Sequence, residues 1–365
     1  MTLIEEPHDP QHTPGEMPVG DDETTLEQLE VAGLSQSQIV RRRFFRHKGA
    51  MTSLVLLVFI LVLSVTSIGV GPVPGLWKYD YNTLIPNSQD ESPTLSVIPS
   101  FVGGGGLHIG DHPFGLDNSK GRDIFALTMR GVQMTMVVIL ILALLSVTIG
   151  ISLGAVSGYF GGWVDAVLMR FTDVILIIPL LLIAAVAGFA YKVSGVWSVA
   201  LILGLLSWTG LARLVRAEFL AYREREFVDA AKVAGASSRR IIFKHILPNT
   251  IGTIVVSTTL LMGAGILTEA ALSFLGFGIQ SPEVSLGSLV SEYQGAFSTR
   301  PWLFVWPGVF IISIVLCLQF IGDGLRDAFD PRQKRIPKRK DLDTSIESAR
   351  AQSSASHEAA AGAAG

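Results

Sequence analysis

The chain has 365 residues, of which 49% are hydrophobic and only 16% are charged, and its mean hydropathy is +0.47. Soluble domains carry about 25% charged residues, so this composition excludes an ordinary soluble domain and indicates a protein that has lipid as its solvent. The net charge of -3 excludes no class of partner, and the single cysteine, Cys317, excludes an intrachain disulfide bond.

The two ends of the chain are polar. Residues 1–40 contain no basic start followed by an apolar core, which a cleavable signal peptide requires, so the first apolar run is predicted to remain as a membrane anchor. Residues 1–40 and 336–365 lack periodic apolar positions and are predicted to be disordered tails.

Between the tails, residues 41–335 are predicted to form a membrane domain. A helix needs about 20 mostly apolar residues to cross the hydrocarbon core of a bilayer. Runs of this kind predict an all-α membrane protein with six transmembrane helices, at about residues 51–70, 132–157, 172–191, 194–214, 248–270 and 302–323. A turn is predicted at Gly158, Gly161 and Gly162 after the second span. Segment 71–123, which contains the run Gly103 to Gly106, is predicted to be a large outer loop.

Lysine and arginine residues set the orientation, because they are concentrated in cytoplasmic loops. If the N-terminus is cytoplasmic, 22 of the 28 basic residues fall on the inner side: five within 41–48, Arg170, eight within 213–244 and eight after the last span. The outer segments then hold only Lys78, Lys120, Arg122, Arg130, Lys192 and Arg300. Both termini are therefore predicted to be cytoplasmic.

The inner loop 216–248, between the fourth and fifth spans, has the most specific pattern. Acidic residues begin its first predicted helix, where the helix dipole favours them. Gly235 suits the left-handed position that ends a helix, and Ser237 or Ser238 can cap a second one. Pro248 is predicted to start the fifth span. The first helix would offer a partner groove the side chains of Phe227, Val228, Ala230, Ala231 and Val233.

The spacing in this loop resembles that of a known family. Asp229-Ala230-Ala231, Gly235 and Leu247-Pro248 are similar to the Glu-Ala-Ala loop of ABC importer permeases, with Asp229 in place of the usual glutamate. Around His245, the sequence Lys-His-Ile-Leu-Pro-Asn resembles the peptide-transporting branch of that family.

Other segments resemble the C-type permeases of dipeptide and oligopeptide transporters, and together the resemblance covers about residues 42–332. These segments are His112–Asp117 with Gly121–Asp123, Gly158–Asp165, Glu269–Gly276, and Gly322–Asp327 with Asp330–Arg332. The first departs from the pattern, because the gap from Asp117 to Gly121 is one residue longer than usual and Leu116 replaces the more common threonine.

The resemblance implies a type I ABC importer permease fold with a cytoplasmic coupling helix, in a bacterial plasma membrane. It implies half of a translocation pathway for di- or oligopeptides, formed with a homologous sister permease as a heterodimer. It also implies two cytoplasmic ATP-binding subunits and an extracellular or lipid-anchored peptide-binding protein as partners. The residues implied to couple the chain to the ATPase subunits are Glu226, Phe227, Val228, Asp229, Ala230, Ala231, Val233, Gly235, Ala236, Ser237, Arg239 and Arg240.

The sequence contains no Gly-x-x-x-x-Gly-Lys-Ser/Thr phosphate loop, so the chain is not expected to be an enzyme. ATP and magnesium are expected on the partner subunits, and no cofactor is expected on this chain. A self-contained secondary transporter is an alternative of another class, but it predicts charged or discontinuous helices at the bilayer midplane, whereas these spans are nearly free of charge. Within the leading class, nickel or another small solute is the alternative to peptide.

Two groups of polar residues have competing interpretations. Glu269, near the outer end of the fifth span, is either an intramembrane functional carboxylate or a structural hydrogen-bonding group, and the small residues around it favour the second. His108, Asp111 and His112 resemble metal ligands but lack a firm third or fourth partner in their Gly-rich loop, so no metal site is predicted.

Overall fold

The computed structural model describes residues 36–85, 92–95, 109–117, 121–191 and 195–330. Apart from two antiparallel hairpins of two-residue strands, the elements of this part are helices. In chain order they are α2 (Gln36–Arg46), α3 (Lys48–Ile68), β1 (Gly69–Val70), β2 (Val73–Pro74), β3 (Leu116–Asp117), β4 (Arg122–Asp123), α4 (Ile124–Phe160), α5 (Gly162–Ile177), α6 (Leu180–Tyr191), α7 (Val196–Leu206), α8 (Trp208–Arg223), α9 (Glu226–Val233), α10 (Ser238–Arg240), the π-helix η2 (Ile241–Ile246), α11 (Leu247–Phe274), α12 (Leu286–Tyr293), the 3-10 helix η3 (Gln294–Ala296) and α13 (Pro301–Phe329).

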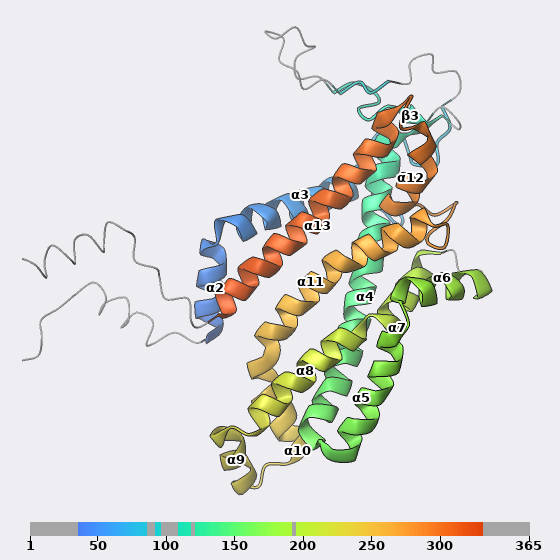
Figure 1. Cartoon of the computed structure of the whole chain (residues 1–365). Coiled ribbons are helices and arrows are strands. Elements are labelled where there is room, and N and C mark those ends of the chain that lie inside the picture. The colour runs from blue at the N-terminus through green and yellow to red at the C-terminus, as the bar shows by residue number, and fades with distance from the viewer. Residues whose placement is uncertain (1–35, 86–91, 96–108, 118–120, 192–194, 331–365) are drawn as a thin grey trace, which may run out of the picture.

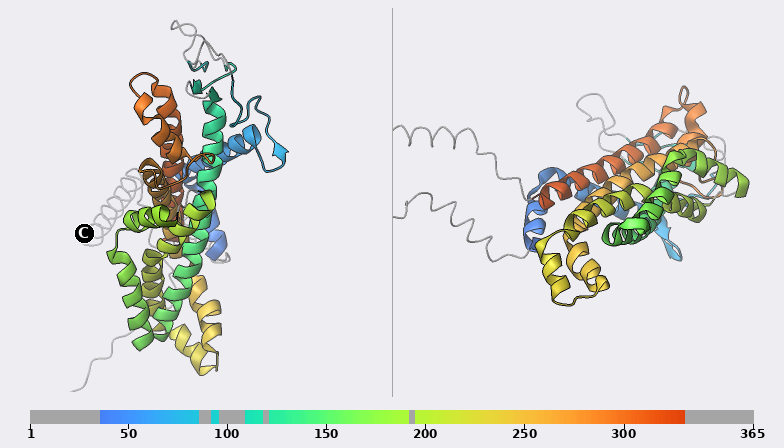
Figure 2. Two further views of the ribbon diagram at one scale, coloured as in Figure 1. Left: turned by 90° about the vertical axis from the view of Figure 1, so that its right-hand side faces the viewer. Right: turned by 60° about the horizontal axis from the view of Figure 1, so that its bottom comes forward.

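The helices form an elongated bundle around the long helix α4 (Figures 1 and 2). Helix α4 packs most extensively against α8 and α7, while α11 packs against α13, and α13 against α3. Helices α9 and α10 lie at one end of the bundle, and β3 and α12 lie towards the other (Figure 1). Buried apolar side chains form three clusters, one at the middle, one at the α12 end and one beneath α9.

Five continuous or nearly continuous helical segments are long and apolar enough to cross a membrane, and α5 with α6 makes a sixth if the bent pair is one span. Two of the five combine elements named above: Val196–Arg223 joins α7 and α8, and Ser238–Phe274 joins α10, η2 and α11, whereas the other three are α3, α4 and α13. The all-α class with up to six spans, predicted from the sequence, is therefore confirmed for the described residues.

The third predicted span is not the straight helix that the sequence analysis placed at 172–191. Helix α5 already begins at Gly162, and it meets α6 at an angle of 77°. The break lies at Ile178, which has extended backbone angles and is followed by Pro179. The proline ring disfavours the helical conformation for the residue before it, and proline has no N–H to donate, so the chain bends here.

The second predicted helix was too short, and the glycine turn predicted after it is confirmed at Gly161 and Gly162 but not at Gly158. Helix α4 runs from Ile124 to Phe160, so Gly158 lies inside it and the turn is at Gly161. A Cβ on Gly158 would lie 2.6 Å from Cβ of Phe219 and 2.7 Å from the carbonyl oxygen of Arg216, both on α8. A Cβ on Gly154, one turn earlier, would lie 2.5 Å from the carbonyl oxygen of Ala212. These glycines therefore permit close contact between two helices, as small residues at four-residue spacing do in membrane proteins.

Two further boundaries differ from the prediction. Helix α2 begins at Gln36, so residues 36–40 of the predicted disordered tail are helical and the predicted domain start at 41 is too late. Arg43 on α2 donates to the carbonyl oxygen of Asp330 at 3.0 Å, and α2 packs along α13. Helix α12 was not predicted at all, although Ser285 and Ser288 form a capping box at its start. The predicted disorder of residues 1–35 and 336–365, and the run Gly103 to Gly106, lie outside the described residues.

Candidate functional site

The inner loop is built around the short helix α9, which stands at the end of the bundle away from α12 (Figure 1). Its inward side rests on Val228, whose side chain is fully buried, and on the half-buried Ala231. Val228 packs in the cluster beneath α9 with Phe219 of α8 and Ile241 of η2. The prediction that Val228 contacts a partner is wrong, because α8 and η2 come together behind α9 and cover that side chain.

The outward side of α9 is exposed and mixed in chemistry. Phe227 and Val233 are apolar and exposed over 41% and 90% of their surface. Ala230 is exposed beside them, and Asp229 forms an exposed ion pair with Lys232 at 2.9 Å. An exposed pair of this kind contributes at most about 1 kcal/mol, so it orients side chains more than it stabilises the fold. Helix α9 thus presents a small apolar surface with a charged edge.

The end of α9 has the geometry that the sequence predicts. Gly235 adopts a positive φ of 78°. Its N–H donates to the carbonyl oxygen of Lys232 at 2.9 Å, and the next N–H, of Ala236, donates to the carbonyl oxygen of Ala231 at 3.0 Å. These two bonds define a Schellman motif, for which glycine is the favoured residue. The left-handed end predicted at Gly235 is confirmed, and the chain is turned sharply back toward the membrane.

After the turn, the chain enters the fifth span without a break. Ser237 caps the helix start through its hydroxyl, which accepts from the backbone N–H of Arg240 at 3.4 Å. Helix α10 then continues through the π-helical turn η2 into α11. The prediction of a separate short helix before Pro248 is therefore wrong. A π-turn shifts backbone hydrogen bonding by one residue, which accommodates Pro248, a residue that has no N–H to donate.

Beside this turn lies an open pocket of about 380 Å³ lined by Ser237, Arg239, Arg240 and Phe243. Arg239, Arg240 and Phe243 are exposed, while Ile241 and Ile242 of the same segment are buried. The sequence-predicted residues of the loop therefore divide into two sets: Val228 is buried and Ala231 and Ala236 are half-buried against the cluster beneath α9, whereas the others are exposed on α9 and the following turn.

Polar contacts connect the base of α8, which leads into α9, to the α4–α5 turn. Arg216 donates through Nη2 to Asp165 at 2.6 Å, and the Ser157 hydroxyl donates to the same carboxylate. Arg223 donates to the carbonyl oxygen of Tyr159 at 3.2 Å, and Arg213 pairs with Asp173 further along α5. Thr172 is the one buried residue of α5, so α5 has little apolar packing. The pairs Asp165–Arg216 and Asp173–Arg213 are therefore a major part of the contact between α5 and α8.

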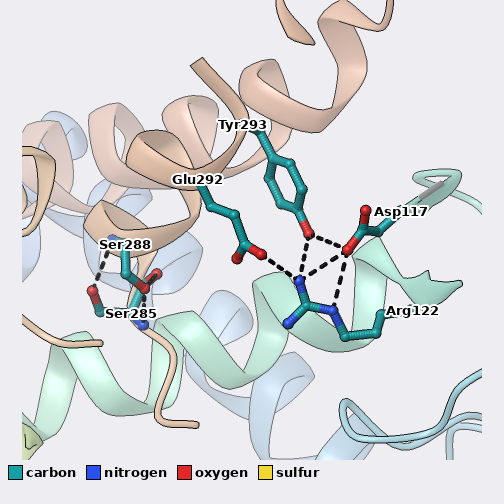
Figure 3. Close-up of polar contacts among 6 residues, drawn as sticks. All are labelled: Asp117, Arg122, Ser285, Ser288, Glu292 and Tyr293. Atoms are coloured by element: carbon teal, nitrogen blue, oxygen red, sulfur yellow. Dashed lines mark hydrogen bonds and ion pairs between the residues drawn. The ribbon is translucent and has the colours of Figure 1, made fainter. Parts of the chain in front are cut away.

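At the other end of the bundle, Asp117 and Arg122 of the β3–β4 hairpin form a polar cluster with Glu292 and Tyr293 of α12 (Figure 3). We call this cluster the outer clasp, after the side of the membrane on which the sequence predicts it. Arg122 forms ion pairs with Asp117 at 2.9 Å and Glu292 at 2.7 Å. The Tyr293 hydroxyl donates to Asp117 at 3.0 Å. The side chains of Asp117 and Arg122 are only 3% and 11% exposed, so the clasp joins the β3–β4 hairpin to α12 through a largely buried ion pair.

Burial raises the pKa of the Tyr293 hydroxyl above its ordinary value, and the negative charge of Asp117 raises it further. The hydroxyl therefore stays protonated at every physiological pH and can keep donating to Asp117. Arg122, whose positive charge faces both carboxylates, provides the compensating charge that a buried aspartate needs.

His112 and Asp123 of the same segment serve the start of α4. Asp123 is fully buried and caps the helix, since its Oδ1 accepts from the N–H of Ala126 at 2.8 Å. Its Oδ2 lies 2.7 Å from Nδ1 of His112. Burial raises the pKa of the Asp123 carboxyl, while the hydrogen bonds to His112 and Ala126 lower it. The described residues contain no group of three or more potential metal ligands, and His108 lies outside them.

Glu269 has the structural role that the sequence favoured. Its side chain is fully buried, and Oε1 accepts from the hydroxyls of Ser273 at 2.8 Å and Ser285 at 2.7 Å. Ser285 also caps α12, accepting from the N–H of Ser288 at 3.1 Å. Glu269 therefore ties the outer end of α11 to the start of α12.

These features define a multi-pass helical membrane protein with an anchored, outward-facing helix at one end. The chain matches the family model of the binding-protein-dependent transport system inner membrane component over residues 146–335, and that of the N-terminal TM domain of oligopeptide transport permease C over residues 35–93. This chain belongs to the family of inner membrane permease components of binding-protein-dependent ABC transport systems.

Several curated relatives of this chain are named as permease proteins. The oligopeptide transport system permease protein OppC of Haemophilus influenzae is 36% identical over 309 residues, which cover 85% of this chain and 93% of the relative. The protein of the same name from Mycobacterium bovis is 36% identical over 303 residues, covering 83% and 97%. A putative peptide permease protein of Brucella ovis is 42% identical over 227 residues, covering 60% and 73%.

Among solved structures, an inward-facing form of the MetNI methionine ABC transporter is similar, with a TM-score of 0.47 and 19% sequence identity. The match covers 56% of this chain and 96% of the chain in that structure.

Proposed function

We propose that this chain is the permease subunit of an ATP-driven importer of di- or oligopeptides and forms half of its translocation pathway. The names of the relatives that match most of its length, which are oligopeptide and peptide permeases, support the substrate class. A homologous sister permease would complete the pathway. Two cytoplasmic subunits would bind ATP and magnesium and hydrolyse the ATP, and an extracellular or lipid-anchored protein would deliver the peptide.

The observation that carries this proposal is the construction of α9. Helix α9 has eight residues, of which one is buried while its other face is exposed. A helix this short is not stable in water on its own and needs contacts with other parts of a protein. Here Val228 anchors α9 to the protein, the Gly235 turn fixes its end, and the exposed Phe227 and Val233 are left for a partner. We assign this outer face, with Glu226, Asp229, Ala230, Ala236, Ser237, Arg239 and Arg240 around it, to contact with an ATPase subunit.

A displacement of α9 would reach the spans by three routes. Val228 contacts the core shared with α8, and the continuous helix from Ser238 to Phe274 connects the loop to α11. The pair of Asp165 and Arg216 connects α8 to the start of α5. Closure of the ATPase subunits on binding ATP would therefore move α8, α11 and α5 together, which would switch the pathway between its inward-facing and outward-facing states.

The basic residues support the orientation that this mechanism requires, with α9 and both termini in the cytoplasm of a bacterial cell. Helix α9 and the segment that follows it carry four exposed basic residues, which are Lys232, Arg239, Arg240 and Lys244. Lysine and arginine are retained on the cytoplasmic side of membrane proteins.

Reconstitution in proteoliposomes tests the function. The complete set of this chain, its sister permease, the ATPase subunits and the binding protein should accumulate a labelled peptide only when ATP is supplied on the ATPase side. Omitting this chain should abolish uptake. Peptide uptake by this chain alone, without ATP, would contradict the proposal, and uptake of Ni²⁺ but not peptide by the complete set would overturn the substrate class.

A further inference from the structure

We infer that helix α2 and the first residue of α3 form a binding surface for anionic phospholipid headgroups of the inner leaflet. The inference depends on the orientation of the chain in the membrane and not on what the chain transports. It concerns a face of the protein remote from α9, since α2 and α9 lie at separate places on the inner side (Figure 1).

Helix α2 lies at headgroup depth because of the sequence that follows it. Lys48 begins α3, and no charged residue follows until Lys78, so the hydrocarbon region starts just beyond Lys48. A short break at His47 separates the two helices, and α2 turns away from the axis of α3 (Figure 1). A helix in this place meets the phosphate layer and not the acyl chains.

The contacts of α2 with the protein fix which of its faces is free. Phe44 packs against the central core cluster, and Arg43 donates to the carbonyl oxygen of Asp330 at the end of α13. His47 caps α3 and lies 3.5 Å from Asp327 of α13. These contacts direct one side of α2 toward α13.

The opposite side carries Arg41, Phe45, Arg46 and Lys48, all exposed. Within the described part of the chain, the side chains of Arg41, Arg46 and Lys48 make no hydrogen bond or ion pair. Phe45 is 58% exposed among them. The bias of basic residues toward the cytoplasm accounts for the charges, but it does not account for an exposed phenyl ring, which gains stability only where apolar surface adjoins it. A boundary between phosphates and acyl chains satisfies both kinds of side chain.

The number of basic residues in this short stretch also fits a lipid site. Arg41, Arg42, Arg43, Arg46 and Lys48 lie within eight consecutive positions directly before the apolar run of α3. Clusters of four to eight basic residues beside a span are typical of sites for anionic lipid.

The test uses the purified full-length chain in detergent, titrated with dioctanoyl-phosphatidylglycerol or with dioctanoyl-phosphatidylcholine, with binding followed by the shift in the midpoint of thermal unfolding. Phosphatidylglycerol should stabilise the chain and phosphatidylcholine should not, and inorganic phosphate should not compete. Each basic residue near an anionic headgroup contributes about fivefold to affinity, so Arg41→Gln should weaken binding about fivefold and Arg41→Gln with Lys48→Gln about 30-fold.

The matched control is Lys244→Gln, which removes one exposed positive charge from η2, the turn that directly follows α10 and so lies apart from α2 (Figure 1). It should bind phosphatidylglycerol as the unmodified chain does, and Arg41→Lys, which retains the charge, should do so within about twofold. Equal binding of the two lipids would overturn the inference. So would an equal loss of affinity in Arg41→Gln and Lys244→Gln, because it would show that the attraction is spread over the whole inner face.

Discussion

Val233→Asp should abolish ATP-driven peptide uptake while leaving the chain folded and inserted in the membrane. The Val233 side chain is 90% exposed, so the substitution removes almost no packing from this chain. If the outer face of α9 is seated in a groove of an ATPase subunit, however, a carboxylate there loses its water without gaining a partner. Changing a central residue of a protein interface weakens the free energy of binding by about 2 kcal/mol or more. For this chain, such a change corresponds to an association with the ATPase subunit that is about 30-fold weaker.

The measurement for Val233→Asp is retention of the ATPase subunits by the immobilised permease pair, together with peptide uptake in proteoliposomes. Leu76→Asp is the matched control, because Leu76 is 89% exposed but lies in the segment between β2 and β3 and not on α9. It should retain the ATPase subunits in full. Equal retention by both variants would mean that α9 makes no contact with the ATPase.

Arg122→Ala should lower the free energy of unfolding by about 3–5 kcal/mol, the range found when one partner of a buried ion pair is removed. The substitution leaves the Asp117 carboxylate buried beside Tyr293 without its positive partner, and it also releases Glu292. The loss should appear as a lower midpoint of thermal unfolding in detergent.

Lys78→Ala is the comparison for Arg122→Ala. Lys78 pairs with Asp111 at 3.4 Å, but the two side chains are 66% and 72% exposed, so water screens the pair and the midpoint of thermal unfolding should change little. Equal midpoints for Arg122→Ala and Lys78→Ala would show that the outer clasp does not hold the β3–β4 hairpin to α12.

What the sequence predicted well depends on contacts between residues close together in the chain. The end of α9 at Gly235 and the cap at Ser237 follow from the backbone preferences of glycine and serine, and both are present. The bend at Pro179 also has a local signal, since proline disfavours helix in the residue before it. The apolar run continues on both sides of this proline, and an unbroken run of this length predicts one straight span.

What the sequence did not predict depends on contacts between distant segments. Val228 has the apolar character of an interface residue, and only the packing of α8 and η2 behind it shows that it is buried. Arg122 and Glu292 are 170 residues apart, and neither residue type specifies the other. Gly158 was predicted to lie in a turn, and only the position of α8 beside it shows that it lies inside α4 and permits close helix packing.

The central claim, that the exposed face of α9 contacts an ATPase subunit, is tested most directly by site-specific cross-linking. Cys317 is the single cysteine of the chain and is buried, so Val233→Cys would add the one readily accessible thiol. Labelled with a maleimide carrying a photoreactive group and illuminated in the assembled transporter, this position should cross-link to an ATPase subunit. Val228→Cys, on the buried side of α9, should not. An assembled, ATP-hydrolysing complex in which Val233→Cys forms no cross-link to an ATPase subunit would contradict the account.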